Sequence, residues 1–217
     1  WDFGAWTLRS VRTGKYLTED KNFFDETPQD KNAVTIDPGM NCTADVVFGW
    51  FVKELLYAKE EDGVLYLDTW QHRAVAVNDE NKLLAKVVSG DCPCKQFTLE
   101  VVSSGVERVA ELAQRADHVI VCAGNQPLIN AREEYDRPDI RLPKAQTALL
   151  NAAAAANEST LLYLVTGYPF AINKEKDTAK AVLCSTHLGP CLGHVAAATV
   201  FGENNPAGRT PTTWYRS

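Results

Sequence analysis

The run His118-Val-Ile-Val-Cys-Ala123 decides the fold of the second half of the chain. It is short, apolar and rich in β-branched residues, which predicts a buried strand. The alanine-rich segment 146–156 predicts a helix, and Pro143 suits the first turn of it. Leu161-Leu-Tyr-Leu-Val165 and Ala181-Val-Leu-Cys184 predict two further strands. Strands that alternate with helices predict a parallel sheet with helices on both faces.

Two more helices complete this half. Apolar residues at helical spacing predict one over residues 106–113, and Gly193–Phe201 predicts another that ends at Gly202. Three strands make a thin sheet, so we expect residues 104–217 to be part of a larger α/β domain. Within the first strand we expect Cys122 to be buried as a small hydrophobic residue.

Residues 1–103 predict an all-β module. Runs rich in β-branched and aromatic residues alternate with turn residues, which is typical of a small barrel or sandwich. The predicted strands cover residues 6–11, 15–18, 33–36, 51–52, 64–67, 74–77 and 97–102. The predicted turns are Thr13-Gly14, Asp37-Pro-Gly39, Asp62-Gly63 and Asn78-Asp79. Aromatic side chains that could stack on sugars or fill a core are Trp6, Tyr16, Trp50, Tyr66 and Trp70.

The module also contains an internal repeat. Phenylalanine recurs at intervals of roughly 45 to 49 residues, at Phe3, Phe48 and Phe97. Leu8-Arg-Ser-Val11, followed by Thr13-Gly-Lys-Tyr-Leu17, resembles the repeat opening of fascin-like β-trefoil modules. A trefoil has three such units, whereas this chain shows two and an initial stub that resembles the end of another. We therefore expect an incomplete trefoil whose first repeat lies upstream of Trp1.

A polar loop, Asn130-Ala-Arg-Glu-Glu-Tyr-Asp-Arg137, follows the strand that ends at Ala123. Open α/β sheets place their ligand sites outside the carboxyl ends of the strands, so this loop is the candidate site. Taken alone, its charges fit either a solvated loop or an acid/base site. No nucleophile elbow, phosphate-binding glycine loop or zinc-spaced cysteine pairs occur in the sequence.

Three blocks of the second half resemble the carboxyl-terminal sandwich domain of the family 3 glycoside hydrolases. The first is Gly124 to Pro143, which includes the polar loop and ends in Ile-Arg-Leu-Pro. The second is Leu164-Val-Thr-Gly-Tyr-Pro169. The third is Phe201-Gly-Glu-Asn-Asn-Pro-Ala-Gly-Arg-Thr-Pro211. Their order and spacing together identify the chain as similar to the β-glucosidase and β-xylosidase enzymes of this family.

The resemblance implies a division of the catalytic groups between domains. In the family the nucleophile is an Asp on a barrel, and the acid/base is a Glu that the sandwich domain extends over the sugar. Glu133 matches that Glu, and the adjacent Glu134 is the second choice. Arg132 belongs to the same motif, and we expect Asp136 and Arg137 to pair and hold the loop. Ala131 stands where the family usually has Gly, and Pro190-Cys191 replaces its Gln-Glu.

The resemblance also implies a fold and a domain layout. Some family members carry an extra β-module inserted in the sandwich domain. We therefore expect an α+β chain of two parts, with a fascin-like trefoil at 1–103 and the second half of a flavodoxin-like α/β sandwich at 104–217. The expected partners are a β-glycoside substrate, the barrel and the first half of the sandwich. Because no nucleophile-bearing barrel is present, we expect this chain alone to be inactive.

Composition excludes several other classes. The net charge is −6 and the pI near 5.3, which argues against nucleic acid as a partner. No run approaches the apolar length of a membrane helix, and no cofactor or metal motif is present. Localisation stays open, with secretion favoured over the cytoplasm. The alternative function is a non-catalytic module that binds carbohydrate or protein.

Overall fold

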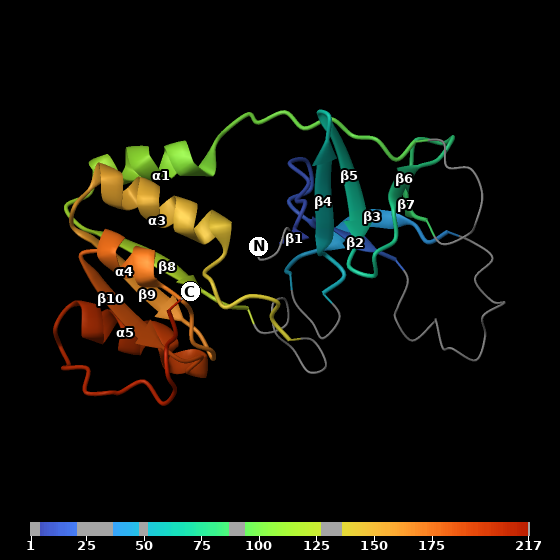
Figure 1. Cartoon of the computed structure of the whole chain (residues 1–217). Helices are drawn as coiled ribbons and strands as arrows, with labels where there is room; N and C mark the ends of the chain where they lie inside the picture. The colour runs from blue at the N-terminus through green and yellow to red at the C-terminus, as the bar shows by residue number, and fades with distance from the viewer. Residues whose placement is uncertain (1–4, 21–36, 48–51, 87–93, 127–135, 217) are drawn as a thin grey trace. The chain divides into compact units, whose positions relative to one another are not determined.

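The computed structural model describes residues 5–20, 37–47, 52–86, 94–126 and 136–216. The chain divides into two compact units, Trp1–Val101 and Val102–Ser217 (Figure 1). This division falls two residues before the boundary that the sequence suggests. None of the described helices is long and apolar enough to cross a membrane.

The first unit is built from short antiparallel strands. In its described part, β1 (Ala5–Trp6), β4 (Leu56–Glu61) and β5 (Val64–Thr69) form one sheet in the order β1-β4-β5. Two further pairs join β2 (Tyr16–Glu19) to β3 (Met40–Ala44) and β6 (Val75–Val77) to β7 (Leu83–Ala85). The all-β prediction for this part of the sequence is therefore confirmed in its described residues, whereas its assignment as a trefoil stays a prediction.

The β4–β5 hairpin shows how sequence pattern sets the two faces of a sheet. Its two-residue turn is Asp62-Gly63, with φ values of 50° and 78°, as the sequence predicts. Opposite residues share a face, so Leu56, Leu65 and Leu67 point into the core together. The residues between them along the strands therefore lie on the outer face.

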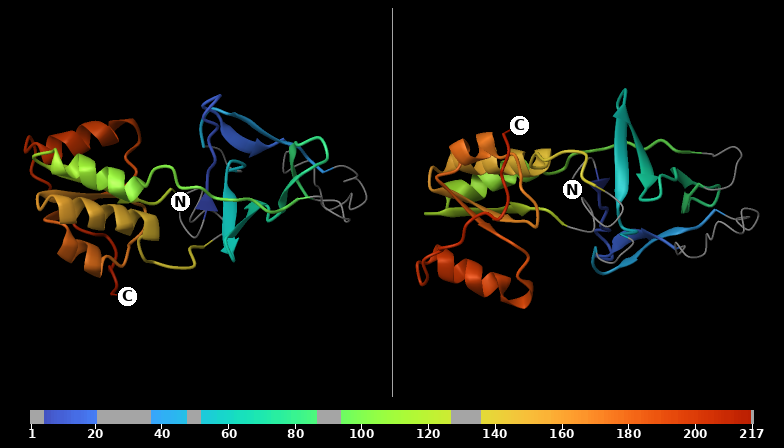
Figure 2. Two further views of the ribbon diagram at one scale, coloured as in Figure 1. Left: turned by 90° about the horizontal axis from the view of Figure 1, so that it is seen from above. Right: turned by 60° about the horizontal axis from the view of Figure 1, so that its bottom comes forward.

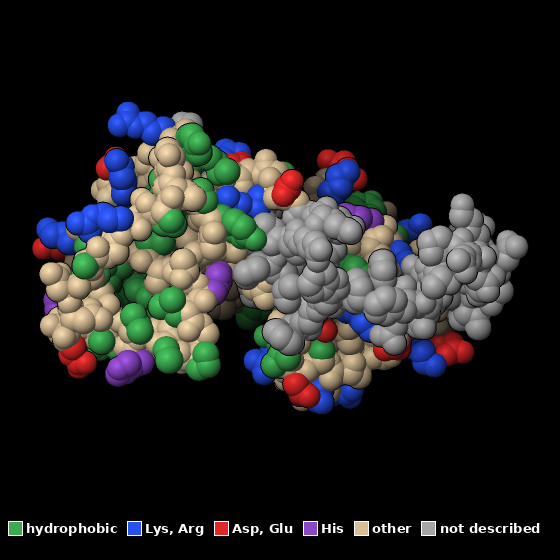
Figure 3. Space-filling view, turned by 90° about the horizontal axis from the view of Figure 1, so that it is seen from below, with side chains coloured by type: hydrophobic (Ala, Val, Ile, Leu, Met, Phe, Trp, Pro, Cys, Tyr) green, Lys and Arg blue, Asp and Glu red, His purple; other side chains and the backbone are tan. Residues whose placement is uncertain are grey.

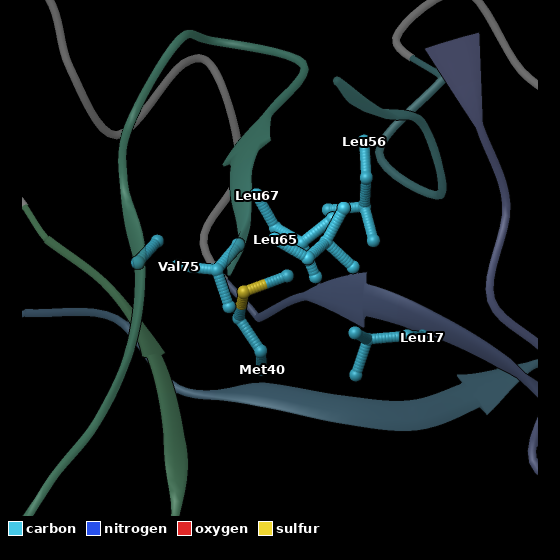
Figure 4. Packing of buried hydrophobic residues seen from close by; sticks show 7 residues of the cluster. Leu17, Met40, Leu56, Leu65, Leu67 and Val75 are labelled. Atoms are coloured by element: carbon cyan, nitrogen blue, oxygen red, sulfur yellow. The ribbon is translucent and has the colours of Figure 1, made fainter. Parts of the chain in front are cut away.

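The core of this unit gathers side chains from most of its strands (Figure 4). Its buried members are Leu17, Met40, Leu56, Leu65, Leu67, Val75 and Ala85. Beside this core lies a buried ion pair, in which Arg73 Nη1 donates to Glu19 Oε1 at 2.5 Å. The Glu19 side chain is fully buried, so its charge is tolerated only because Arg73 pairs with it.

Several strand and turn predictions in this unit need correction. Beyond Phe97, which bridges Leu65, residues 98–102 form no strand, and Val52 is not in a strand. Asp37-Pro-Gly39 is not a turn, because Gly39 bridges Leu84 and Pro38 accepts a hydrogen bond from Ala85. The predicted strand 33–36 lies outside the described residues, and β3, β4 and β7 were not predicted.

Glu54, just before β4, is a second buried carboxyl group, with 7% of the residue exposed. Burial raises its pKa above the ordinary value of 4.5, although a backbone hydrogen bond and Lys53 act in the opposite direction. The unfolded chain ionises first as the pH rises, so this group weakens folding above pH 4.5.

Glu54→Gln is therefore expected to stabilise the chain at pH 7. The gain should become much smaller at pH 4, where the wild-type carboxyl is mostly protonated in both states. Urea unfolding at the two pH values measures it, and Glu60→Gln, on the exposed end of β4, is the matched control. Equal stabilisation at both pH values would show that charge burial is not the cause.

The second unit is an α/β structure around a parallel sheet. Its strands are β8 (Val119–Gly124), β9 (Thr160–Val165) and β10 (Ala181–Ser185), in the order β10-β9-β8. Helix α3 (Lys144–Ala156) connects β8 to β9, and α4 (Asn173–Thr178) connects β9 to β10. The three predicted strands and their parallel arrangement are confirmed, whereas α4 was not predicted.

Helices lie on both sides of this sheet. Figure 2 shows α1 (Gly105–Gln114) and α3 side by side on one side and α5 (Leu192–Val200) on the other. The short 3₁₀ turn η3 (Gly189–Cys191) leads into α5. The buried core lies under α3 and consists of Ala123, Leu142, Leu150, Leu162, Leu164, Phe170 and Ala179.

The face of the sheet opposite this core is only partly covered. Tyr163 is buried there, but Ile120 on β8 is 46% exposed and Cys122 is also exposed. The expectation of a buried Cys122 was therefore wrong, because it points away from the face that α3 covers. Among the described residues, the outer edge of β8 pairs with no strand.

Candidate functional site

The candidate site lies at the edge of the sheet where the three parallel strands end. β8, β9 and β10 end at Gly124, Val165 and Ser185. Val165 is paired in register with Gly124 on one side and with Ser185 on the other. The loops that follow these strands therefore start from one edge. This is the position at which the polar loop was predicted to lie.

Gly124 fixes the start of the loop after β8. Its φ is +144°, and a Cβ atom there would come within 1.9 Å of the Val165 carbonyl oxygen. Gln146, on α3, holds the same residue from the other side: its amide accepts from Gly124 N at 2.9 Å and donates to Gly124 O at 3.0 Å. Only glycine allows β8 and β9 to approach this closely.

Asn125 links the first loop to the second. It is 7% exposed, and its Oδ1 accepts a hydrogen bond from Gly167 N at 3.1 Å. Its buried Nδ2 has no hydrogen-bond partner among the described residues. The Thr166 hydroxyl donates to Tyr168 O at 2.7 Å and closes the turn that presents Gly167. A buried amide donor at the start of the candidate loop is thus held in place with its hydrogen available.

Arg137 fixes the far end of the polar loop. Its Nη2 donates to the Pro169 carbonyl oxygen at 3.1 Å, and its guanidinium lies over the rings of Tyr168 and Phe170, at 4.9 and 5.1 Å from their centroids. A cation between aromatic rings and a carbonyl oxygen is well held. The supporting position predicted for Arg137 therefore has a structural counterpart in the loop after β9.

Asp136 was expected to pair with Arg137 in that support, and it is exposed. The guanidinium contacts Pro169 and the two rings, and the supporting role of Asp136 stays a prediction. Arg132, Glu133 and Glu134 lie outside the described residues.

A carboxylate further along the same segment is paired. Asp139 accepts two hydrogen bonds from Arg141, one from the Arg141 backbone N–H at 2.8 Å and one from the Arg141 Nε at 2.6 Å. This pairing lowers the pKa of Asp139 to about 2. Asp139 therefore stays ionised near neutral pH and is no candidate for a proton donor.

Histidine from the third loop also comes close to this edge. The His187 ring lies 4.0 Å from the position that a Cβ atom on Gly167 would take. His194, in contrast, is exposed on α5. Within the described residues, no group of three or more His, Cys, Asp or Glu side chains is placed to hold a metal ion.

The comparison with protein families decides the assignment. The sequence model described as the glycosyl hydrolase family 3 C-terminal domain matches residues 13–217. The chain belongs to this family. The match covers most of the all-β unit as well as the unit with the parallel sheet.

Individual relatives agree with this family assignment. Beta-D-xylosidase 3 of Arabidopsis thaliana is 28% identical over 220 residues, covering 89% of this chain and 28% of the relative. The periplasmic beta-glucosidase of Salmonella typhimurium is 31% identical over 112 residues, covering 52% of this chain and 14% of the relative. The chain thus spans between about a seventh and a little over a quarter of the length of these relatives.

One solved structure is also similar to this chain. Beta-glucosidase from Kluyveromyces marxianus, in complex with glucose, matches with 22% identity and a TM-score of 0.49. The match covers 62% of this chain and 15% of that one.

Proposed function

We propose that this family 3 domain supplies the general acid/base, Glu133, of a retaining β-glycosidase that hydrolyses terminal β-linked sugars. The observation that supports the proposal is the position of the described residues on either side of the family motif. The loop that contains it begins beside Asn125, which is bound to Gly167, and ends beside Arg137, which is bound to Pro169. Both ends are therefore fixed to the edge of the sheet where α/β proteins place their sites.

The proposed chemistry needs two carboxyl groups on either side of the glycosidic bond, roughly 5 to 5.5 Å apart in a retaining enzyme. Glu133 gives its proton to the leaving oxygen as the bond to the sugar breaks. An Asp of the barrel takes the sugar as a covalent ester. The Glu133 carboxylate then accepts a proton from water, which releases the sugar and restores the acid.

The neighbouring charged residues have supporting roles in this proposal. Arg137 anchors the carboxyl end of the loop, and Arg132 and Asp136 keep the loop polar beside the carboxyl group. Glu134 is the second choice as acid/base. On an extended segment adjacent side chains point to opposite sides, so only one of the two glutamates reaches the sugar.

The barrel and the first half of the sandwich complete the site in this proposal. Two features of the second unit support a partner of this kind. The outer edge of β8 is unpaired among the described residues, and such an edge is a template for a further strand. Ile120 on β8 and Leu112 on α1 are 46% and 55% exposed, which leaves apolar surface for a partner to cover.

The first unit, in the same proposal, is an incomplete fascin-like β-trefoil inserted in the sandwich domain. Two features support this trefoil assignment. All the described strands of the unit are short and pair in antiparallel fashion, and the sequence near Leu8 resembles a repeat opening. The second candidate function is carbohydrate binding without catalysis. It is favoured by the outer face of the β4–β5 hairpin in this unit.

The chain alone tests the division of the catalytic groups. Purified and incubated with 4-nitrophenyl β-D-xyloside and β-D-glucoside, it is expected to release no nitrophenol above the uncatalysed rate, because the nucleophile belongs to the barrel. A family 3 enzyme assayed beside it serves as the positive control. Hydrolysis by the chain alone at a normal enzymatic rate would overturn the proposal.

A further inference from the structure

The outer face of the β4–β5 hairpin carries an unusual set of side chains. Tyr57 is opposite Asp68, and Lys59 is opposite Tyr66, all on the face that points away from the core. Both tyrosines are half-buried, and Asp68 and Lys59 are exposed. Gln96 Nε2 donates to the Tyr66 hydroxyl at 3.4 Å, which fixes that ring from the next segment of chain.

His72 adds a second ring to this face. It stacks on Tyr57 with a centroid distance of 5.0 Å and an angle of 13° between the planes. The imidazole is exposed, so the side of it that faces away from Tyr57 is open to solvent. The pair therefore presents a flat aromatic surface beside the Asp68 carboxylate.

The backbone of His72 carries a second indication of function. Its φ is +60°, which glycine or asparagine adopts far more easily. The other described non-glycine residues with positive φ are Asp62 and Asn81, residue types that tight turns favour. A turn alone does not require a histidine at this position. Strain of this kind at an exposed ring is a feature of ligand-binding sites.

The turn that presents His72 is firmly built. His72 N donates to Thr69 O, and Thr69 N donates to Arg73 O, both at 2.8 Å. Arg73, the next residue, is tied to the buried Glu19 carboxylate at 2.5 Å. The ring pair is thus set on a rigid support, so a ligand meets a surface that is already ordered.

The charges on this face select the class of ligand. Lys59 pairs with Glu61 at 2.5 Å, so its positive charge is already compensated. Asp68 has no ion pair with a described residue, which leaves a carboxylate that accepts hydrogen bonds. This excess of negative charge repels anionic ligands. Flat rings next to a hydrogen-bond acceptor suit a neutral molecule with one apolar face and several hydroxyl groups.

We propose that Tyr57, His72 and Asp68 form a binding site for a neutral pyranose oligosaccharide, separate from the carboxyl edge of the parallel sheet. The C–H face of one sugar ring lies on the His72 imidazole, and Asp68 accepts from a sugar hydroxyl. The site is independent of the proposed catalysis, since its residues belong to the first unit and take no part in proton transfer.

Isothermal titration of the whole chain with xylohexaose and cellohexaose tests this site. At least one of them is expected to bind, and His72→Gly, which keeps the backbone conformation, should lower the association constant about tenfold, the scale of one lost ring contact. Tyr57→Ala and Asp68→Asn should weaken binding as well. Tyr215→Ala, an exposed tyrosine of the second unit, should leave it unchanged.

Any one of three results would overturn the proposed site. The first is the absence of binding heat with both sugars at millimolar concentration. The second is full affinity in both His72→Gly and Tyr57→Ala, and the third is preferred binding of heparin. Circular dichroism confirms that each variant is folded before titration. Loss of binding in a variant that retains its melting temperature therefore reports the surface and not the fold.

Discussion

Replacing Glu133 with glutamine, in a protein that joins this chain to a family 3 barrel, is expected to slow hydrolysis of alkyl β-glycosides by about 10²- to 10⁴-fold. The amide cannot give a proton to the leaving oxygen, and an alkoxide leaves poorly without one. With 2,4-dinitrophenyl β-glycosides the bond breaks without proton assistance, so the same variant should form the glycosyl intermediate at a nearly normal rate. Steady-state and burst kinetics on both substrates measure the difference.

Glu134→Gln is the matched control, because it removes an identical carboxyl group one residue away. It should affect both substrates alike and by less than about tenfold. If Glu134→Gln shows the dependence on the leaving group and Glu133→Gln does not, the roles of the two glutamates are exchanged. If neither variant shows it, the acid/base assignment to this loop fails and the binding function gains support.

Gly124→Ala is expected to destabilise the second unit strongly. The new methyl group would come within 1.9 Å of the Val165 carbonyl oxygen, and alanine strongly disfavours a φ of +144°. The strands must separate at the point where Asn125 N donates to that oxygen. Steric overlap and backbone strain together should cost about 3 kcal/mol, which lowers the melting temperature by roughly 10 °C.

Gly193→Ala is the matched control for this measurement. Gly193 lies in α5, and a Cβ atom there meets nothing within 4 Å. Alanine favours a helix over glycine, so this variant should melt at or slightly above the wild-type temperature. A Gly124→Ala chain that melts within about 2 °C of the wild type would contradict the close approach of β8 to β9.

The second unit could be predicted because its sequence signals are strong and local. The apolar runs predict the strands β8, β9 and β10, and the alanine-rich segment predicts the helix α3. Helix α4 was missed because six charged or polar residues, Asn173–Thr178, give no apolar stripe. Its position depends on tertiary packing, which shows in the buried Glu175 that accepts from Thr147 at 2.8 Å.

The first unit was harder to predict because its strands are short and depend on partners far away in the sequence. β4 (Leu56–Glu61) carries three charged residues at its end and was not predicted, yet it is the central strand of its sheet. The run from Phe97 to Val102 is rich in β-branched residues, but only Phe97 forms a bridge, because no neighbouring strand among the described residues continues beside the rest of the run. Local propensity cannot report whether a partner strand is present.

The sequence predicts a position for the candidate site but not the residues that support it. The strand, the loop and the helix after it follow from the sequence pattern, and the family motif singles out Glu133. Gln146 and Asn125 carry no sequence signal for their roles, since an amide on a helix or a loop has many ordinary uses. The contacts of Arg137 with Pro169 and two rings could not be predicted from the sequence, because they arise only in the folded loop.

Chemical rescue by azide tests the role of Glu133 as the acid/base most directly, and it uses Glu133→Ala in the protein that joins this chain to a family 3 barrel. Azide is already an anion, so it attacks the glycosyl intermediate without a general base and replaces the missing step. We expect azide to restore turnover of 2,4-dinitrophenyl β-glycosides, and we expect the product to be a β-glycosyl azide with the configuration retained. Unchanged turnover and free sugar as the only product would contradict the assignment of Glu133 as the acid/base.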